Sequence, residues 1–491
     1  MTRLLMKQIF LPLCLLLMLS ACSDGDETVI NIQAPESDGG GSPGTGSSGD
    51  GSGTDSSADC PEGTTDLNGG LCELPAIISE DMTLDSGLKY LMSGRVTVGN
   101  GNGQIEVNSD GSLDNGSAVQ AVTLTIEPGV EVLGKTGTFA NILITRGSQL
   151  MAVGTVDAPI VFSSDDEGYE GSGEWGGLII HGYAPHNECA EGGNYCDIDA
   201  EGESGFAGGY APEDSSGILR YVVVAEGGYE FSTGNEINGI SLVAVGSGTE
   251  MDFIQVHGNS DDGIEFYGGT VNLKHGVFTS NNDDSVDWDE GYQGNLQYII
   301  VKQGASKGEA FEMDTEGSSE GFLSKPTLAN VTIINDKVAD RATYSLNFKK
   351  RSGGFFHNTV ITVAETSETD VNTCINVDGS GSEALVSTAL VLNNWIQDCG
   401  QGAGSHGTLS SANVVFDASS ITETDAQLDD LLSSQSPEAV GLAPLDWESI
   451  NGAFPESVAD SDYLDSTDFI GAVNPDGSDP WWAGWTLSGS L

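Results

Sequence analysis

Three short segments of this 491-residue chain repeat a pattern of acidic residues at nearly constant spacing. The first, NSDDGIEF, begins at Asn259, and the second, NNDDSVDWDE, begins 22 residues later at Asn281. A looser third copy, EAFEMDTE, begins at Glu309. Carboxylates that recur in this way could bind a divalent cation or serve as a general acid and base, depending on how the fold brings them together.

The repeat period predicts the fold that would position these carboxylates. A period in the low twenties, with short alternating strands and Gly, Asn and Asp at the turns, is typical of a parallel β-solenoid with one turn per repeat. A two-sheet sandwich could also show short strands, but not such a regular step. Acidic residues of successive turns would then be neighbours, about 4.8 Å apart: Asp261 beside Asp283, Asp262 beside Asp284, and Glu265 beside Asp287 and then Glu312.

Calcium binding is the first hypothesis for this column of charges. Like charges at that spacing are costly unless a cation neutralises them or water screens them. Carboxylate and amide oxygens from adjacent turns would form the flexible all-oxygen cage that Ca²⁺ prefers. Strand alternation would direct the three acids within strands outward as a strip on the surface. The predicted metal ligands are Asp261, Asp262, Glu265, Asp283, Asp284, Asp287 and Glu312.

Catalysis is the alternative use of the same carboxylates. The Asn-Ser-Asp261 element followed by Asp283 and Asp284 resembles the NTD…DD arrangement of polygalacturonase-type β-helix hydrolases, which implies a catalytic pair of one protonated and one ionised carboxyl. The Gly-His-Gly and Arg-Ile-Lys elements of those hydrolases do not follow Asp284. A polysaccharide lyase would instead need a basic residue, for which Lys274 and Lys302 are candidates.

A purely structural interpretation also stands. Asn and Asp at the corners of β-helix turns satisfy backbone groups and tolerate tight dihedral angles. This would account for the residues in the turns. It accounts poorly for Glu265, Asp287 and Glu312, which we expect within strands.

The composition limits the classes of partner. The formal net charge is −58, with only 16 Lys and Arg residues, so we expect no nucleic-acid partner, because binding to phosphate depends on basic side chains. Such acidity suits a salty or calcium-rich medium in which repulsion is screened. The six histidines are dispersed and show no catalytic triad or helical metal motif.

The N-terminus predicts export and lipidation. Arg3 and Lys7 precede an apolar run that ends at LSAC, with the cysteine at position 22. This pattern is typical of a lipoprotein signal peptide, residues 1–21, cleaved so that Cys22 carries acyl chains such as palmitate. Residues 22–59 are rich in Gly, Ser and Asp and predict a flexible tether. We expect a lipid-anchored protein of the outer membrane, exposed at the cell surface.

The remaining six cysteines predict disulfides, because they form an even number of sequence-local residues in an exported chain. A zinc site is the alternative, although no histidine lies at ligand spacing near them. The expected pairs are Cys60 with Cys72, Cys189 with Cys196, and Cys374 with Cys399.

The predicted organisation is therefore all-β. A small disulfide-closed segment, 60–75, precedes a parallel β-helix over 76–420, and the tryptophan-containing segment 421–491 is expected to cap the open end of the core. A sugar-stacking platform is the other role open to those tryptophans. Loops at 163–176, 184–217 and 226–236 are expected to emerge from one side of the solenoid.

Several motifs together resemble a family of bacterial surface lipoproteins with a right-handed, pectin-lyase-like parallel β-helix. They are GEWGGLIIHG from Gly173, NEINGISL from Asn235, GSGTEMDFIQV from Gly246 and SDDGIEFYGGTVN from Ser260. The resemblance implies a single-stranded β-helix and a location in the cell envelope. Some members look like accessory partners of TonB-dependent receptors.

We therefore predict a non-catalytic lipoprotein that presents an acidic, calcium-binding β-helix to a ligand or receptor. The membrane would be contacted through Cys22, and the partner would be a TonB-dependent receptor or a surface glycan. The alternative is an extracellular polysaccharide lyase or glycoside hydrolase that uses Asp261, Asp283 and Asp284.

Overall fold

A computed structural model of the chain describes fifteen stretches of sequence, and all structural statements below concern them. Every described residue belongs to one compact body, Ser56–Leu491. The predicted signal peptide, Cys22 and nearly all of the tether lie outside the described residues. These residues are 59–105, 110–189, 193, 195–200, 202–230, 236–304, 308–315, 323–335, 344–363, 373–377, 390–397, 421–423, 444–451, 462–475 and 479–491.

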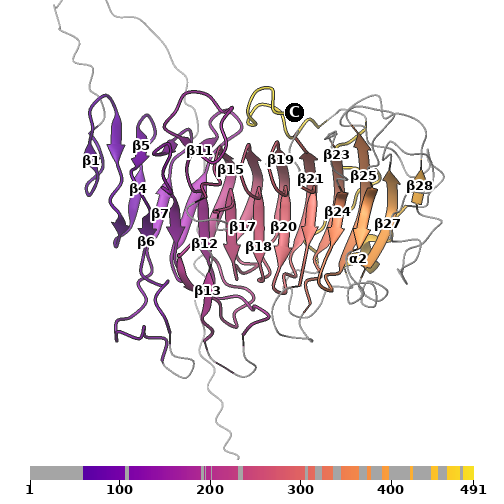
Figure 1. The fold of residues 1–491 in the computed structure, drawn as a ribbon, viewed down its shortest axis with the longest axis horizontal. Coiled ribbons are helices and arrows are strands. Elements are labelled where there is room, and N and C mark those ends of the chain that lie inside the picture. Colours follow the sequence, from indigo (N-terminus) through magenta and orange to yellow (C-terminus); the bar gives the residue numbers. More distant parts are fainter. Residues whose placement is uncertain are drawn as a thin grey trace, which may run out of the picture. The chain divides into compact units, whose positions relative to one another are not determined.

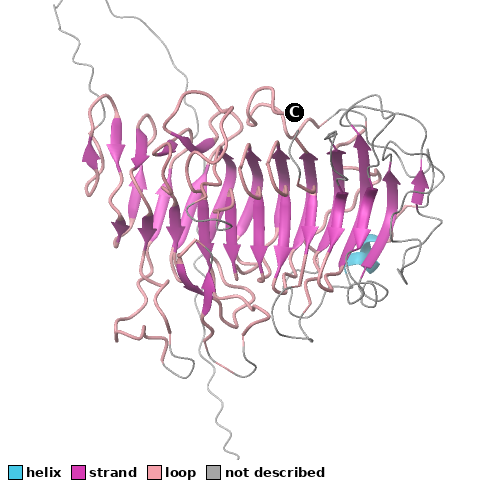
Figure 2. Ribbon diagram, in the orientation of Figure 1, coloured by secondary structure: helices cyan, strands magenta, loops and turns pink. Residues whose placement is uncertain are grey.

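The body is a parallel β-helix, which confirms the predicted fold class (Figures 1 and 2). Its smaller sheet has ten described strands. Each strand lies next to the one that follows it in this list: β3 (Ile77–Ile78), β6 (Val96–Val98), β9 (Ile142–Ile144), β12 (Leu178–His181), β16 (Ile240–Val243), β18 (Ile264–Tyr267), β20 (Val286–Asp289), β22 (Phe311–Met313), β24 (Tyr344–Phe348) and β26 (Thr373–Val377).

The larger sheet has sixteen described strands. From β15 to β27, successive described strands alternate between the two sheets, so that each of these turns contributes one strand to each sheet. The sixteen are β1 (Thr65–Asp66), β2 (Leu71–Glu73), β4 (Met82–Leu84), β5 (Lys89–Met92), β7 (Thr123–Ile126), β8 (Glu131–Gly134), β10 (Gln149–Val153), β11 (Ile160–Ser164), β15 (Gly217–Ala225), β17 (Glu250–His257), β19 (Leu273–Thr279), β21 (Asn295–Lys302), β23 (Thr327–Asn335), β25 (Gly354–Val363), β27 (Leu390–Gln397) and β28 (Ile421–Glu423).

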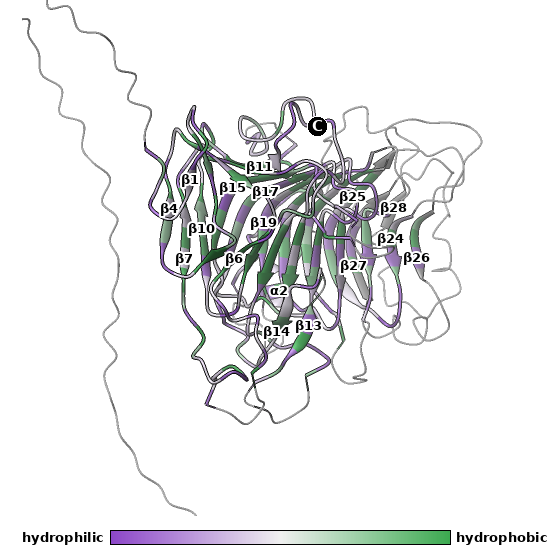
Figure 3. Cartoon of the chain, turned by 60° about the vertical axis from the view of Figure 1, so that its left-hand side comes forward, coloured by the Kyte–Doolittle hydropathy of each residue, from purple (hydrophilic) through white to green (hydrophobic). Residues whose placement is uncertain are grey.

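The core lies between the sheets. Apolar residues, green in Figure 3, are concentrated in the strands. On β18 and β20 the alternate residues Ile264, Phe266, Val286 and Trp288 point inward and are fully buried. Burial of each such side chain contributes about 1.5–3 kcal/mol, and this periodic gain fixes which residues of each strand face outward.

The long strands of the larger sheet bend at one residue in the left-handed region of backbone conformation. The ladder pairing skips this position in each turn. The rings of its first four occupants stack, with centroids 4.4, 4.3 and 4.8 Å apart, and this stacking offsets a backbone strain of roughly 1–2 kcal/mol per residue. The column consists of Tyr221, Phe253, His275, Tyr298, Asn330, Asn358 and Asn394.

The described C-terminal residues after β28 lie along the side of the larger sheet, rather than over the end of the core as the sequence suggested, whereas β28 extends that sheet beyond β27. Trp485 is buried against Val223 and Val277, which project from the outer face of the larger sheet. Apolar residues on that face need cover, and the tryptophan-rich segment supplies it. The structure also contains a hairpin of β13 (Ile198–Ala200) and β14 (Gly205–Ala207), and a helix, α2 (Trp447–Asn451).

The disulfide predictions are confirmed where both cysteines are described: Cys60 bonds to Cys72, and Cys189 bonds to Cys196. Cys374 is also disulfide-bonded, but its expected partner, Cys399, lies outside the described residues. The segment 60–75 that the first disulfide closes is not separate from the β-helix, because β2 pairs in parallel with β5 and so belongs to the larger sheet. Among the described residues, no helix is long and apolar enough to span a bilayer.

Candidate metal centre

The turns that precede β18 and β20 place two aspartates in equivalent positions, one turn of the helix apart. Oδ1 of Asp262 accepts a hydrogen bond of 2.8 Å from the amide of Asp284. Oδ1 of Asp284 in turn accepts one from the amide of Glu309. Both side chains are buried, so each has a structural role at a corner, as the purely structural interpretation expects.

Burial also perturbs the acidity of this pair. The pKa of Asp262 is raised well above its ordinary value, first by burial and then by the charges of Asp287, Asp261 and Asp283. The pKa of Asp284 is raised in the same way, by burial and then by Asp262. These carboxyls therefore gain from protonation or from a neighbouring cation.

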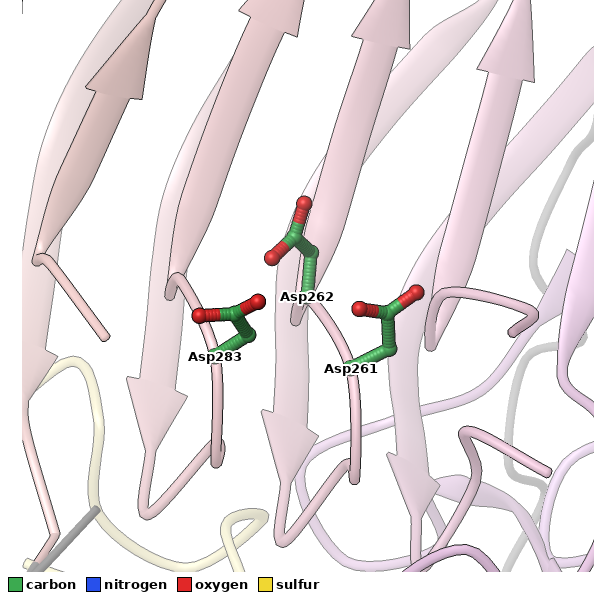
Figure 4. A group of neighbouring side chains, drawn as sticks. All are labelled: Asp261, Asp262 and Asp283. Atoms are coloured by element: carbon green, nitrogen blue, oxygen red, sulfur yellow. The ribbon is translucent and has the colours of Figure 1, made fainter. Parts of the chain in front are cut away.

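A second pair lies at the outer side of the same turns. Asp261 is half-buried and Asp283 is exposed, and each offers an oxygen within 4.8 Å of the others and of Asp262. Figure 4 shows the three carboxylates on two adjacent turns, with Asp262 just before β18. The predicted neighbours Asp261 and Asp283 are thus brought together, at a position that solvent can reach.

The strand acids form the predicted ladder. Glu265 of β18 is in register with Asp287 of β20, which is in register with Glu312 of β22. They point away from the core, as expected, but they do not form an exposed strip: Glu265 and Asp287 are each only 8% exposed. Asn238 helps to cover the ladder, because its Nδ2 donates to Glu265 at 2.5 Å and to the hydroxyl of Tyr267 at 3.0 Å.

Asp287 is the central residue of the cluster. Its oxygens lie within 4.8 Å of ligand atoms of Asp262 and Glu265 on one side, and of Asp284 and Glu312 on the other. Its Oδ1 is buried and has no hydrogen-bond partner among the described residues. Its pKa is raised well above the ordinary value, first by burial and then by Glu265, Asp289, Asp284 and Asp314.

Among the described residues, basic side chains pair with acids at one end of this cluster. Lys349 forms an ion pair with Glu312, and Lys350 lies 3.2 Å from Asp314. Lys274, considered above as a lyase base, is paired instead with Asp465 at 2.9 Å, and its strand belongs to the other sheet. Lys302 ends β21, also in that sheet.

Two of the expected loops converge on the acidic turns. The amides of Gly173 and Ser260 both donate to the carbonyl of Gly227, at 2.8 and 2.9 Å. Nδ2 of Asn282 donates to Ser172 at 2.7 Å. These contacts place loop 163–176 and the described start of the next loop, 226–230, beside the acidic turns.

Sequence reasoning missed several members of this region. Asp289 follows Asp287 by two residues on β20, so the same alternation that selected Asp287 could have included it. Asp314, which lies within the third copy of the repeat two residues after Glu312, is also buried. The pKa of Glu236 is raised by burial and then by the charges of Glu230 and Asp283, so Glu236 is a further acid near the site. No sequence signal marks that last residue.

The set predicted from sequence divides into three overlapping groups that could each hold one cation. The outer group is Asp261, Asp262 and Asp283, the inner group is Asp262, Glu265 and Asp287, and the upper group is Asp284, Asp287 and Glu312. Oxygen-only clusters of this kind fit Ca²⁺, which accepts irregular geometry.

Comparison with known families assigns the fold. The model of the pectate-lyase-like β-helix domain matches residues 76–486 of the chain. Neither the curated proteins nor the solved structures include a significant match. Since the match covers most of the chain, this protein belongs to the pectate-lyase-like β-helix domain family.

Proposed function

We propose that this protein is a non-catalytic surface lipoprotein whose β-helix binds calcium through its acidic ladder. The observation that carries this proposal is Asp287, a buried carboxylate with an oxygen that has no partner among the described residues, surrounded by further carboxylates. A buried unpaired charge costs several kcal/mol, and a divalent cation would remove that cost for the whole group.

The inner and outer groups are the favoured ion sites. They share Asp262, whose Oδ1 accepts a hydrogen bond from a backbone amide. This bond fixes the position of the carboxylate in both groups. The exposed Asp283 gives an ion access from solvent. The upper group is less suited, because Lys349 already pairs with Glu312.

The N-terminal sequence supports an envelope location. A signal peptide, residues 1–21, followed by Cys22 would deliver a lipid-anchored protein, and the Gly/Ser/Asp-rich tether 22–59 would hold the body clear of the membrane. In this position the calcium-stabilised β-helix would present its loops to a TonB-dependent receptor or to a surface glycan.

Polysaccharide cleavage is the second candidate. It is favoured by one observation: carboxyls with a raised pKa, Asp262 and Asp284, lie beside the accessible Asp283. The oxygens of Asp261 and Asp283 lie within 4.8 Å, which is closer than the separation of about 6.5–9.5 Å between the carboxyls of an inverting pair. Asp284 is also buried, so it is poorly placed to contact a glycan.

Calorimetric titration of the metal-stripped protein with calcium tests the proposal. We expect saturable binding that Asp287→Asn and Asp261→Asn each weaken at least tenfold. The matched control is Glu250→Gln, an acid of the larger sheet with 59% side-chain exposure, which should bind calcium as the native chain does. Absence of binding at millimolar calcium would refute it. Turnover of an acidic polysaccharide, lost in Asp283→Asn but independent of calcium, would favour the enzyme instead.

A further inference from the structure

A second site lies in a cavity far from the acidic ladder in sequence. The cavity has a volume of about 590 Å³, and three of its walls carry half-buried tyrosines, Tyr183, Tyr195 and Tyr210. Two carboxylates, Asp110 and Asp214, also line it, and no basic residue is among the described residues that do so. A volume of this size accommodates a small organic molecule.

The walls of the cavity are fixed by contacts behind them. The amide of Tyr183 donates to Oδ2 of Asp214 at 2.9 Å, and its carbonyl accepts from the amide of Ala211 at 2.8 Å. The Cys189–Cys196 disulfide closes the segment that carries Tyr195. Rigid walls favour binding because little freedom is lost when a ligand enters.

Arg146 joins two of these walls from the buried side. Its guanidinium donates to the carbonyl of Cys196 at 3.0 Å and lies 5.6 Å from the ring centroid of Tyr183. The guanidinium forms an ion pair of 3.0 Å with Asp197, which neutralises its positive charge next to the cavity. Arg146 thus already contacts Tyr183 from the buried side, and Tyr195 and Tyr210 supply the other aromatic side chains of the lining.

The chemistry of the lining selects the ligand class. Aromatic faces attract cations, and quaternary ammonium groups are recognised by clusters of aromatic rings with nearby carboxylates. A bare metal ion is disfavoured, since no group of three described acids close enough to share an ion includes Asp110 or Asp214. The net charge of −58 also concentrates cations at the surface.

We propose that this cavity binds a small organic cation with a quaternary ammonium group, held between Tyr195 and Tyr210 and neutralised by Asp214. This site is separate from the calcium ladder and does not depend on it. The ligand's methylated head would contact the rings, while its charge would face the carboxylate. The site would give the β-helix a ligand specificity distinct from its metal binding.

The test is titration with choline and with 3,3-dimethylbutan-1-ol, which has the same shape without the charge, at constant ionic strength and saturating calcium. We expect saturable binding of choline, and we expect the neutral analogue to bind at least about tenfold more weakly than choline. Tyr195→Ala should weaken choline binding by about 3- to 30-fold, whereas Tyr195→Phe, which keeps the ring, should nearly preserve it. Tyr169→Ala, an exposed tyrosine outside the cavity, is the matched control.

Each of these results would overturn the proposal: no saturable choline binding to the native chain, equal binding of the neutral analogue, or unchanged binding in a folded Tyr195→Ala variant. Saturable binding of a neutral pyranose in place of choline would also overturn it. If Tyr195→Ala lowers the melting temperature markedly, the comparison of choline with its neutral analogue on the native chain and on Tyr195→Phe still decides the question.

Discussion

Replacing Asp287 by Asn should have opposite effects on stability with and without calcium. Two unit charges 4.8 Å apart repel by about 3.5 kcal/mol at an effective dielectric constant of 20. Asp287 has carboxylate neighbours at or within that distance on both sides of its own strand, so full ionisation of the cluster is strongly unfavourable. In chelator at pH 7 the variant should therefore be more stable than the native chain, by about 1–3 kcal/mol after protonation has relieved part of the repulsion.

Calcium should reverse this order. A ligand at one hundred times its dissociation constant stabilises the folded state by about 2.7 kcal/mol, and the native chain should gain this amount while the Asn variant gains much less. Melting temperatures at a fixed scan rate, in chelator and in calcium, measure both effects. An Asp287→Asn protein that is less stable in chelator, yet fully stabilised by calcium, would show that the carboxylate has a packing role and holds no ion.

Three further outcomes are expected. In chelator, the melting temperature should fall as pH rises from about 4 towards neutral. The pKa values of Asp262, Asp284 and Asp287 are raised in the folded state, which therefore binds more protons than the unfolded state and loses stability as these groups ionise. A flat or rising profile between pH 4 and 7 would contradict this. Trp485→Ala should destabilise the fold by about 3–5 kcal/mol in urea unfolding, since its indole is buried; a change near zero would show that the C-terminal segment is dispensable. Asn330→Ala should lower the free energy of unfolding by about 2–4 kcal/mol, because the variant loses two hydrogen bonds of 3.1 Å to carbonyls and places alanine at φ 55°, where it is strained. Asn330→Gly should recover only the part of this loss that is due to strain.

The sequence predicted the register of the acidic ladder because a single 22-residue step joins two nearly identical segments. Once the turns are equal in length, alternation decides that Glu265 and Asp287 lie on one face, and the structure places them in register. Their burial could not be predicted in the same way. It depends on side chains such as Asn238, which approach from loops of irregular length and carry no periodic signal.

The column of left-handed residues at the bend and the position of the C-terminal segment also could not be predicted from the sequence pattern. Tyr298 and Asn330 occupy equivalent positions in a strained conformation, yet each looks like an ordinary strand residue in sequence. The position of Trp485 is set by contacts with residues more than two hundred positions earlier, such as Val223. Local periodicity holds no information on contacts of that separation, so the tryptophans could be interpreted equally well as an end cap.

The return of the C-terminal segment along the side of the β-helix has a kinetic consequence. In most solenoids each repeat touches only its neighbours, so folding can spread from any point and the ends can fray. Here Gln255 bonds to Leu487 and Ser490, across sequence separations of 232 and 235 residues. Contacts of such separation slow folding, because a long stretch of chain must be ordered before they form. The middle turns would thus gain this protection against unfolding only after the segment that contains Leu487 and Ser490 has docked.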